Sequence, residues 1–314
     1  MLYNNDDEIL EYVEMDDIIP SIPTKNKRKL LLDDIIERSS NNNKSYSYET
    51  RNNSLKRRLF TEDIFCDELE ELDGYYILDD INTLKYIIDE NYRQNIYNRY
   101  DKSKLILNLT NIGDILYIDN DIFNVYKLNI EGCRNIVSIT NLNELKHLNI
   151  KRCNQIEEIS NLNSLESLKI EKCLSLKKID DHFDNLIELE MTECFNIFNI
   201  SNISNIKNMK IIKCVNLSTI SNIINLNKLY IEECNLLKEI IKLDNLESLY
   251  IEKCHKIESL ENLNNLKYLS LNYLKNIKKI NNLEKLESLL VISCLSLEER
   301  LNINDKCYIK VITY

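Results

Sequence analysis

Several residue types are scarce in this chain of 314 residues, and their scarcity limits its chemistry. It has no Trp and no Ala, and only 3 Gly, 2 Pro and 3 His. Motifs of nucleotide-binding, serine-hydrolase and zinc-protease sites are built on glycine or histidine, and none of them occurs. The histidines, His147, His182 and His255, do not stand beside an obvious nucleophile. We therefore expect no enzyme, no catalytic residue, no cofactor and no metal site.

A long apolar segment is also missing. No stretch approaches the roughly 18 consecutive apolar residues of a membrane-spanning helix, and the acidic N-terminus does not resemble a secretory signal. We therefore expect an intracellular, cytoplasmic protein without a membrane partner. Two basic clusters, Lys25–Lys29 and Lys56–Arg58, resemble nuclear-import signals and make a nuclear location an alternative.

An excess of basic residues is missing too. Residues 1–100 contain 13 Lys and Arg against 22 Asp and Glu, and residues 101–314 contain 27 against 29. A nucleic-acid-binding protein usually presents a basic face, so we expect no nucleic-acid partner. The mixed charges of the second segment are instead typical of a solvated surface.

What the chain has in abundance is a repeat. Eight cysteines lie 20 or 21 residues apart, apart from one interval of 40, and Leu274 divides that interval in half. Ile112 lies 21 residues before the first of these cysteines. Around each cysteine slot the pattern L-x-I-x-x-C-x-x-I-x-x-I-x-x-L-x-x-L recurs. The slot cysteines are Cys133, Cys153, Cys173, Cys194, Cys214, Cys234, Cys254 and Cys294.

The spacing of the apolar residues predicts the shape of one unit. The L-x-I segment has the period of a short strand that points both aliphatic side chains to one face. The remaining apolar residues are three apart, which is typical of 3-10 turns or extended arcs and too short for an amphipathic α-helix. A coil of about 20 residues cannot bury enough surface to be stable alone, so the units must stack.

This pattern resembles that of leucine-rich repeat proteins, and the resemblance extends from Leu105 to about Leu301. The cysteine slot resembles the repeats of plant resistance proteins and F-box receptors, and the phrase S-N-L-N-x-L, as at Ser160–Leu165, resembles internalin-type arrays. Abundant Asn, Ile, Lys and Tyr indicate an AT-rich genome, which suggests the repeat family of entomopoxviruses, large insect DNA viruses.

The resemblance implies a monomeric α/β-type solenoid. Its expected shape is a leucine-rich repeat horseshoe with a parallel, concave β-sheet of about ten short strands. The convex side would be thin and made of turns and 3-10 segments, and the N-terminal cap would be helical.

We interpret the slot cysteines as core residues. A metal site needs paired ligands a few residues apart, and no two cysteines here are closer than 13 residues. In a stacked coil the slot side chains form an inward column with one thiol per rung, about 4.8 Å apart. They lie parallel rather than pointing at one another. We therefore predict reduced, structural thiols that donate weak hydrogen bonds to the backbone.

The pattern also predicts the limits of the domains. Residues 1–60 are polar with little periodicity, so we predict a disordered tail with acidic and basic clusters. Residues 61–104 are predicted to form a helical N-terminal cap, because Asp79–Asp101 has helical apolar spacing. Residues 105–301 are predicted to form the solenoid and residues 302–314 a C-terminal cap strand.

A binding surface is predicted on the strands. Residues that alternate with Leu and Ile point to solvent on the concave face, and they become aromatic and aliphatic in the last rungs. Exposed apolar residues that cluster on a rigid face mark partner sites more often than scattered ones do. The predicted partner-binding residues are Ile212, Tyr230, Tyr250, Tyr268, Tyr273, Leu290 and Ile292.

Three functions follow from these features. The first is a non-enzymatic module that binds a partner protein through its concave face and, given the viral resemblance, engages a host factor. The second is the substrate-recognition subunit of a ubiquitin ligase with docking helices in residues 61–100, although the Leu-Pro opening of an F-box is absent. The third is a cell-cycle regulator that docks a cyclin through the segment Lys56, Arg57, Arg58, Leu59, Phe60.

The third hypothesis can be tested with a peptide of residues Ser54 to Asp63. The segment KRRLF resembles the cyclin-docking motif, in which a basic residue, a Leu and a Phe engage an apolar groove. We expect the peptide to bind a cyclin in a fluorescence-anisotropy titration, and replacement of Leu59 and Phe60 by Ala to abolish the binding. If the unmutated peptide shows no affinity, the match is a coincidence.

Overall fold

The computed structural model of the chain describes residues 68–113, 115–118, 121–179, 183–281, 283–297 and 307–313. All of them belong to one of two compact units of the chain, Tyr46–Tyr314. The predictions for the N-terminal tail, for the basic clusters and for His182 lie outside the described residues.

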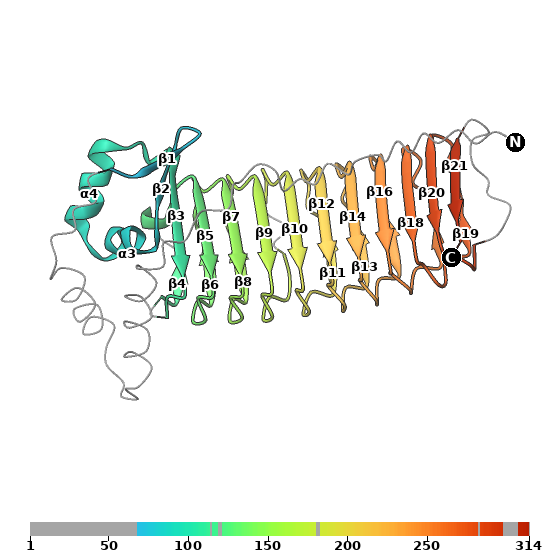
Figure 1. Ribbon diagram of the computed structural model, residues 1–314, viewed down its shortest axis with the longest axis horizontal. Coiled ribbons are helices and arrows are strands. Elements are labelled where there is room, and N and C mark those ends of the chain that lie inside the picture. Colours follow the sequence, from blue (N-terminus) through green and yellow to red (C-terminus); the bar gives the residue numbers. More distant parts are fainter. Residues whose placement is uncertain are drawn as a thin grey trace, which may run out of the picture. The chain divides into compact units, whose positions relative to one another are not determined.

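One long sheet organises this unit (Figure 1). Among the described residues it has thirteen strands in the order β1-β2-β3-β5-β7-β9-β10-β12-β14-β16-β18-β20-β21. From β3 to β20 each strand holds the L-x-I segment of one rung, and neighbours pair in parallel without a shift in register, as Leu148 does with Leu168. The ten strands are β3 Leu105–Thr110, β5 Lys127–Glu131, β7 His147–Lys151, β9 Ser167–Glu171, β10 Glu188–Thr192, β12 Asn208–Ile212, β14 Lys228–Glu232, β16 Ser248–Glu252, β18 Tyr268–Asn272 and β20 Ser288–Ile292.

The return arcs are extended and pair with one another. Among the described residues they form three small parallel sheets with two or three residues per strand. The sequence predicted either 3-10 turns or extended arcs, and most of the arcs are extended. The only 3-10 segments among the described residues, Lys102–Lys104 and Asp121–Phe123, lie in the first two rungs. The arc strands are β4 Tyr117–Ile118, β6 Ser138–Thr140, β8 Glu158–Ser160, β11 Asn199–Ser201, β13 Thr219–Ser221, β15 Glu239–Ile241, β17 Ser259–Leu260 and β19 Lys279–Ile280.

The core fills the space between the long sheet and the arcs. Most of the repeated Leu, Ile and Cys positions are buried and belong to one hydrophobic cluster, and Leu148, Cys153, Ile156 and Leu162 are fully inaccessible. The slot residue of the first rung, Ile112, is only partly buried and packs against this cluster. Parallel strands, short units and a continuous aliphatic core make this a leucine-rich repeat solenoid. The prediction of that fold is confirmed.

Where the structure describes a whole rung, two of its corners take the left-handed backbone conformation, which allows the chain to turn without lengthening the rung. The first corner directly precedes the Cys slot, and its N–H donates to the next rung, as Lys172 does to the carbonyl of Thr192 over 2.9 Å. Nine residues other than glycine have this conformation there: Asn111, Arg152, Lys172, Glu193, Lys213, Glu233, Lys253, Tyr273 and Ser293.

The second corner explains the recurring S-N-L phrase. Asparagine tolerates positive φ better than most residues because its short polar side chain can bond locally. The corner is occupied by Asn141, Asn161, Asn202, Asn222, Lys242 and Asn262, with φ between 55° and 62°.

Other asparagines tie neighbouring rungs together. Their side-chain amides donate to backbone carbonyls one rung back, where a turn leaves those carbonyls without a strand partner. Asn216 donates to Phe195 over 2.7 Å, Asn225 to Ser204 over 2.7 Å, and Asn265 to Asp244 over 2.6 Å.

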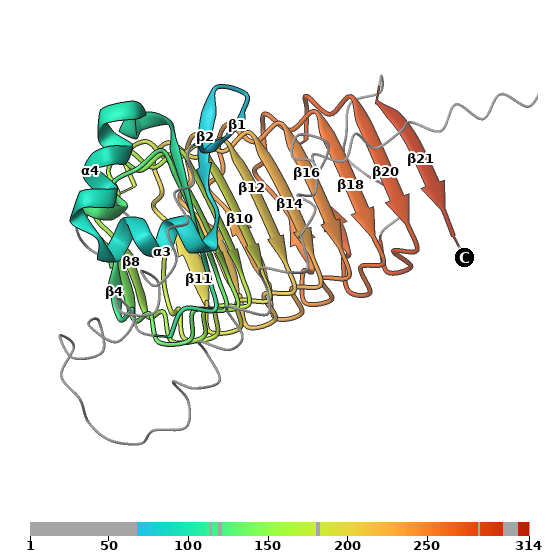
Figure 2. The same cartoon turned by 60° about the vertical axis from the view of Figure 1, so that its left-hand side comes forward.

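The N-terminal end of the sheet is covered by a hairpin and two helices. In Figures 1 and 2 helices α3 (Asp80–Ile88) and α4 (Glu90–Arg99) lie at the β2 end of the long sheet. The Asp79 side chain accepts from the N–H of Asn82 and that of Asp89 from the N–H of Asn91, so each helix has an acidic N-cap. Tyr86 of α3 is fully buried, and its hydroxyl donates to the carbonyl of Ile122 over 3.0 Å.

The hairpin, β1 Glu70–Leu72 and β2 Tyr75–Leu78, was not predicted. Its signal is in the sequence, however. Asp73 and Gly74 both have positive φ, and an Asp-Gly pair between two strand-like segments is typical of a two-residue hairpin turn. Strand β2 then pairs in parallel with β3, so the hairpin extends the long sheet by two strands.

At the opposite end, β21 (Tyr308–Ile312) adds one more parallel strand beside β20. Its register continues that of the rungs, with Leu290 opposite Lys310. The segment between β20 and β21 lies largely outside the described residues.

We predict that Asn222→Gly will be more stable than Asn222→Ala. At a residue with negative φ the alanine variant would be the more stable one, because glycine loses more conformational entropy on folding than alanine does. At Asn222, with φ of 57°, alanine must enter a conformation that costs about 1 kcal/mol or more. Urea denaturation of both variants measures the difference. An alanine variant at least as stable as the glycine variant would contradict the role of this corner.

Candidate protein-binding surface

The exposed face of the long sheet consists of the strand side chains that alternate with the core residues. We call it the strand face. Because the strands pair without a shift, equivalent residues line up in rows across the sheet, about 4.8 Å apart. The central row runs through the middle residue of each strand. It comprises Asn108, Asn129, Asn149, Lys169, Glu190, Lys210, Tyr230, Tyr250, Ser270 and Leu290.

The central row begins with an amide ladder. Asn149 Nδ2 donates to Asn129 Oδ1, and Asn129 Nδ2 donates to Asn108 Oδ1, both over 2.8 Å. Asn108 Nδ2 in turn donates to the carbonyl of Leu78 in the N-terminal hairpin. These amides use one another as partners, so this part of the strand face is polar and internally satisfied.

Ion pairs form the next part of the row. The Glu190 carboxylate lies 3.2 Å from the Lys169 ammonium and 3.3 Å from the Lys210 ammonium, one from each neighbouring strand. Partial burial raises the pKa of Glu190, but the two lysines outweigh that effect and hold the pKa below its usual value. Charge along this stretch therefore alternates from strand to strand, with two ammonium groups around one carboxylate.

An aromatic stack follows. The rings of Tyr230 and Tyr250 are parallel within 2°, and their centroids are 4.4 Å apart. Both rings are half-buried. The spacing of the strands is close to that of stacked rings, so the register of the sheet holds the two side chains face to face.

Each tyrosine is held by a carboxylate on its own strand. Tyr230 donates its hydroxyl proton to Glu232 over 2.8 Å, and Tyr250 donates to Glu252. Burial raises the pKa of both hydroxyls, and the hydrogen bonds and negative charges of these glutamates raise it further. The phenols therefore stay neutral, with their rings fixed by stacking and their hydroxyls fixed by hydrogen bonds.

The remaining predicted residues surround this stack without forming a continuous strip. Ser270 separates Tyr250 from Leu290 in the central row. In the row two residues further along the strands, Glu232, Glu252 and Asn272 separate Ile212 from Ile292.

Two further predicted tyrosines lie at the margin of the strand face. Tyr268 begins β18 and is 49% exposed, and its hydroxyl donates to Glu287 over 3.1 Å. Tyr273 is 41% exposed and lies at a left-handed corner beyond the end of β18. The structure therefore brings Tyr230 and Tyr250 together and leaves the other predicted residues around them.

The polar partners of the stack were not predicted. Glu232, Glu252 and Asn272 lie beside the tyrosine hydroxyls, and Asn272 is only 4% exposed. The signal for the two glutamates is the phrase L-Y-I-E, which occurs in two successive rungs. Residues two apart on a strand share a face, so a tyrosine and the glutamate two residues later lie side by side.

Another aromatic cluster lies at the N-terminal end of the strand face. Tyr75 stacks on Tyr126 with ring centroids 4.1 Å apart, and Tyr126 Oη lies 2.9 Å from Nε2 of His147. Burial and the charge of Lys127 lower the pKa of His147, which favours the neutral imidazole. His147 thus lies on the strand face as predicted, and its near neighbour is a tyrosine hydroxyl. His255 lies in the turn after Cys254.

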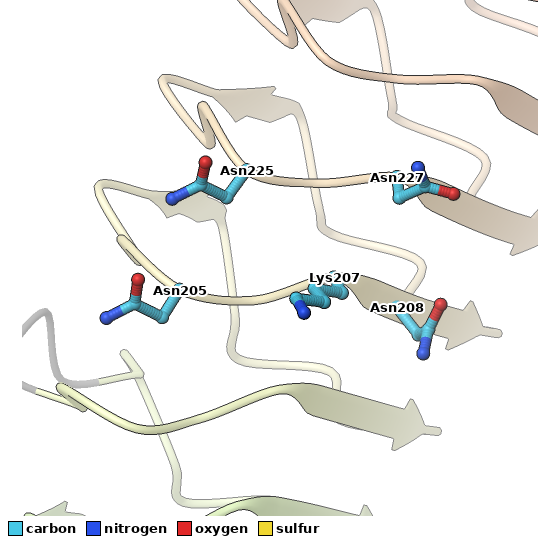
Figure 3. A pocket seen from close by; sticks show the side chains of 5 residues that line it. All are labelled: Asn205, Lys207, Asn208, Asn225 and Asn227. Atoms are coloured by element: carbon cyan, nitrogen blue, oxygen red, sulfur yellow. The ribbon is translucent and has the colours of Figure 1, made fainter.

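An open polar pocket lies where two arcs enter strands β12 and β14 (Figure 3). Its lining is four asparagines and one lysine: Asn205, Lys207, Asn208, Asn225 and Asn227. Asn205 and Asn225 already donate to the carbonyls of Asp184 and Ser204. Asn208 donates to the Glu188 carboxylate over 3.5 Å, so three of the four lining amides already hold rungs together.

The slot cysteines form the expected inward column. All eight are buried and free, and each thiol lies close to the carbonyl two residues before it, as Cys173 does to Glu171 over 3.6 Å. Six of the eight also lie close to a carbonyl of the preceding rung. The Cys133 thiol donates to the carbonyl of Leu109 over 3.5 Å and that of Cys294 donates to Leu271 over 3.4 Å, in each case on the preceding rung. Within the described residues no group of three or more His, Cys, Asp or Glu side chains is placed to hold a metal ion. None of the described helices is both long and apolar enough to cross a membrane.

Comparisons with known proteins add little to this description. No protein-family model matches the chain, and no curated protein matches it. The leucine-rich repeat domain of the type III effector XopL is similar in structure, with 14% identity and a TM-score of 0.44 over 86% of this chain and 96% of that one. A leucine-rich repeat protein from Bacteroides ovatus has 15% identity and a TM-score of 0.20 over 67% of this chain and 78% of its own. At such scores neither similarity supports an argument about function, and the resemblance to insect-virus arrays stays a prediction.

We predict that the slot thiols react only after unfolding. Burial raises the pKa of the Cys173 and Cys294 thiols, and the reactive thiolate is correspondingly disfavoured. In native protein a maleimide should label the half-exposed Cys307 and, as the sequence indicates, Cys66. Mass spectrometry with and without denaturant counts the labelled sites. Rapid native labelling of the slot cysteines, or stoichiometric bound zinc, would contradict their role in the core.

Proposed function

We propose that this chain is a protein-binding module that holds its partner on the strand face, with Tyr230 and Tyr250 at the centre of the contact. The observation that carries the proposal is the parallel stack of these two rings. It presents apolar surface in a fixed orientation, and aromatic residues with fixed rotamers are frequent anchors of protein interfaces.

The architecture supports this proposal because the strand face is not needed for the core. Leu229 and Leu249 carry the packing of these strands from the opposite side, where they are 2% and 1% exposed. The side chains between them are therefore available to a partner. Little conformational entropy remains to be lost on binding, since stacking and the bonds to Glu232 and Glu252 already restrict the rings.

The composition of the face favours the aromatic end over the polar end. Side chains of the amide ladder and of the ion pairs already satisfy one another, so a partner would gain little by replacing those contacts. The stack, by contrast, gains by further burial of its exposed ring surface. If the viral resemblance holds, the partner is a host protein.

The alternatives depend on other parts of the chain. A ubiquitin-ligase role would use the helices of residues 61–100. In α3, however, Leu84 and Tyr86 are buried, and Tyr86 belongs to the hydrophobic cluster of the solenoid, so these apolar side chains are not available to a ligase partner. A cyclin-docking role would use Lys56–Phe60, which lies outside the described residues. Both remain hypotheses that the partner's identity would decide.

We predict that Tyr230→Ala with Tyr250→Ala will weaken capture of the partner at least tenfold. Loss of the stack should reduce the free energy of unfolding by only about 1 kcal/mol, whereas truncation of a central interface aromatic costs roughly 2 kcal/mol of binding or more. The measurement is affinity capture by the full chain from lysate of its native cells, quantified by mass spectrometry, beside a thermal melt.

The matched control is Asn129→Ala with Asn149→Ala, which changes the same central row at its polar end. It should leave capture of the partner unchanged. Loss of capture by the asparagine pair, with the tyrosine pair silent, would place the partner on the other half of the strand face and overturn the proposal.

A further inference from the structure

The two ends of the tyrosine stack are different, and this difference indicates what the partner brings to it. At one end the Lys210 ammonium lies 5.9 Å from the centroid of the Tyr230 ring, over its face. Such a distance is within the range of cation–π attraction. The protein therefore already places a cation on one outer face of the stack.

The other end is open. The residue opposite Tyr250 in the next strand is Ser270, and the residue opposite Ser270 is Leu290. A serine side chain is much shorter than a tyrosine or a leucine, so the central row is low at Ser270, and we call this position between the Tyr250 ring and Leu290 the slot. Two strand spacings of about 4.8 Å separate the two walls. A planar group placed midway would lie at stacking distance from the ring.

The slot has polar groups along one side. Ser270 Oγ donates to Asn272 Oδ1 over 3.3 Å, and Asn272 is buried although it lies on the strand face. Glu252 is the register neighbour of Asn272, and Glu232 is the register neighbour of Glu252. The slot is therefore bounded by an aromatic ring, an aliphatic side chain and a polar edge that includes a carboxylate.

Negative charge gathers at this edge. Three carboxylates, those of Glu232, Glu233 and Glu252, lie at the ends of β14 and β16. The Lys253 ammonium pairs with two of them, at 3.2 Å from Glu233 and 3.1 Å from Glu252. Lys213 occupies the equivalent corner one rung before Glu233, so this edge has three carboxylates against two lysines. The remaining negative charge favours a further cation beside the stack.

We propose that the slot over Ser270 receives the guanidinium group of an arginine in the partner protein, an inference that rests on the proposed function of the strand face. Guanidinium is planar and weakly hydrated, so it stacks on an aromatic ring, and its fork of donors suits a carboxylate. One face would lie on Tyr250, the donors would reach the Glu252 and Asn272 edge, and the aliphatic stem would pack on Leu290. The stack would then carry a cation at each end.

Other side chains fit the slot less well. A phenyl ring would stack on Tyr250 but would bring neither positive charge nor a further donor to Glu252, which already accepts from Tyr250 and pairs with Lys253. A lysine ammonium supplies charge but no plane, and it is more strongly hydrated than guanidinium. The order of preference expected for the slot is therefore arginine, then lysine, with uncharged groups last.

The probe for this preference is a blocked pentapeptide with one central variable residue between glycines. Four versions carry arginine, lysine, citrulline or phenylalanine, and citrulline keeps the planar shape of arginine without its charge. The full chain is prepared with ring-labelled tyrosine, and the Tyr250 signal is assigned from the spectrum of Tyr250→Phe. We expect the arginine peptide to shift this signal in a saturable NMR titration and to bind at least fivefold more tightly than the other three.

Substitution of Ser270 tests the location. Ser270→Tyr extends the stack into the slot and should abolish the arginine-dependent shift, while Ser270→Ala leaves the slot open and should preserve it. Ser167→Tyr, which adds a tyrosine to the strand face on β9, should also preserve it. Glu252→Gln keeps an acceptor for Tyr250 and removes the charge, so it should weaken arginine binding at least threefold. Thermal melts establish that each variant is folded.

The outcomes separate this inference from the proposed function. No saturable arginine binding, equal binding of the lysine or citrulline peptide, tighter binding of the phenylalanine peptide, or full binding by Ser270→Tyr would each overturn the arginine slot. Partner capture from lysate by the same variants is the second readout. Capture lost in the tyrosine double variant but kept in Ser270→Tyr would overturn the slot alone, whereas capture kept in both would overturn the binding role of this face.

Discussion

The constraint on which this structure depends is the zero shift between neighbouring rungs. Each rung returns the chain to the same position one strand further along, so that equivalent core positions, mostly Leu on Leu, Ile on Ile and Cys on Cys, lie on one another over ten strands. Rungs of 20 or 21 residues can do this only if their corners are tight and alike. The left-handed residues supply these corners, and the asparagine amides satisfy the carbonyls that the turns leave open. Asparagine is therefore a structural residue here, both at the left-handed corners and in the bonds between rungs.

The same constraint determines which side chains are neighbours on the strand face. On a face without register shift a row of side chains behaves as a one-dimensional sequence of contacts, each set by the residue one rung before and one rung after. Identical amides make a ladder, alternating charges make ion pairs, and two tyrosines make a stack. The chemistry of a patch thus depends on the order of residues along the row, which is an order taken at intervals of about 20 in the chain.

This explains which features could be predicted from the sequence. The fold and its core follow from the period of Leu, Ile and Cys, because a pattern repeated in every rung outweighs local ambiguity. The sequence could not distinguish extended return arcs from 3-10 turns, because both place apolar residues three apart. The hairpin before α3 occurs once and carries only the Asp-Gly signal, so the periodic pattern does not reveal it. Among the candidate site residues the tyrosine pair could be found from its spacing, but the bonds to Glu232 and Glu252 depend on how the rings lean along the strand.

The slot over Ser270 shows how a regular solenoid acquires a particular site. In the central row the residues after Lys210 are Tyr230, Tyr250, Ser270 and Leu290, and the backbone beneath them does not change. A short side chain between two large ones therefore becomes a gap, because the rung cannot move inward to close it without breaking the pairing on both sides. Lys210 covers the near end of the stack and nothing comparable in the row covers the far end. In a fold where every rung repeats the last, a distinct site can arise only where the repeat is interrupted, and here the interruption lies next to the stack of Tyr230 and Tyr250.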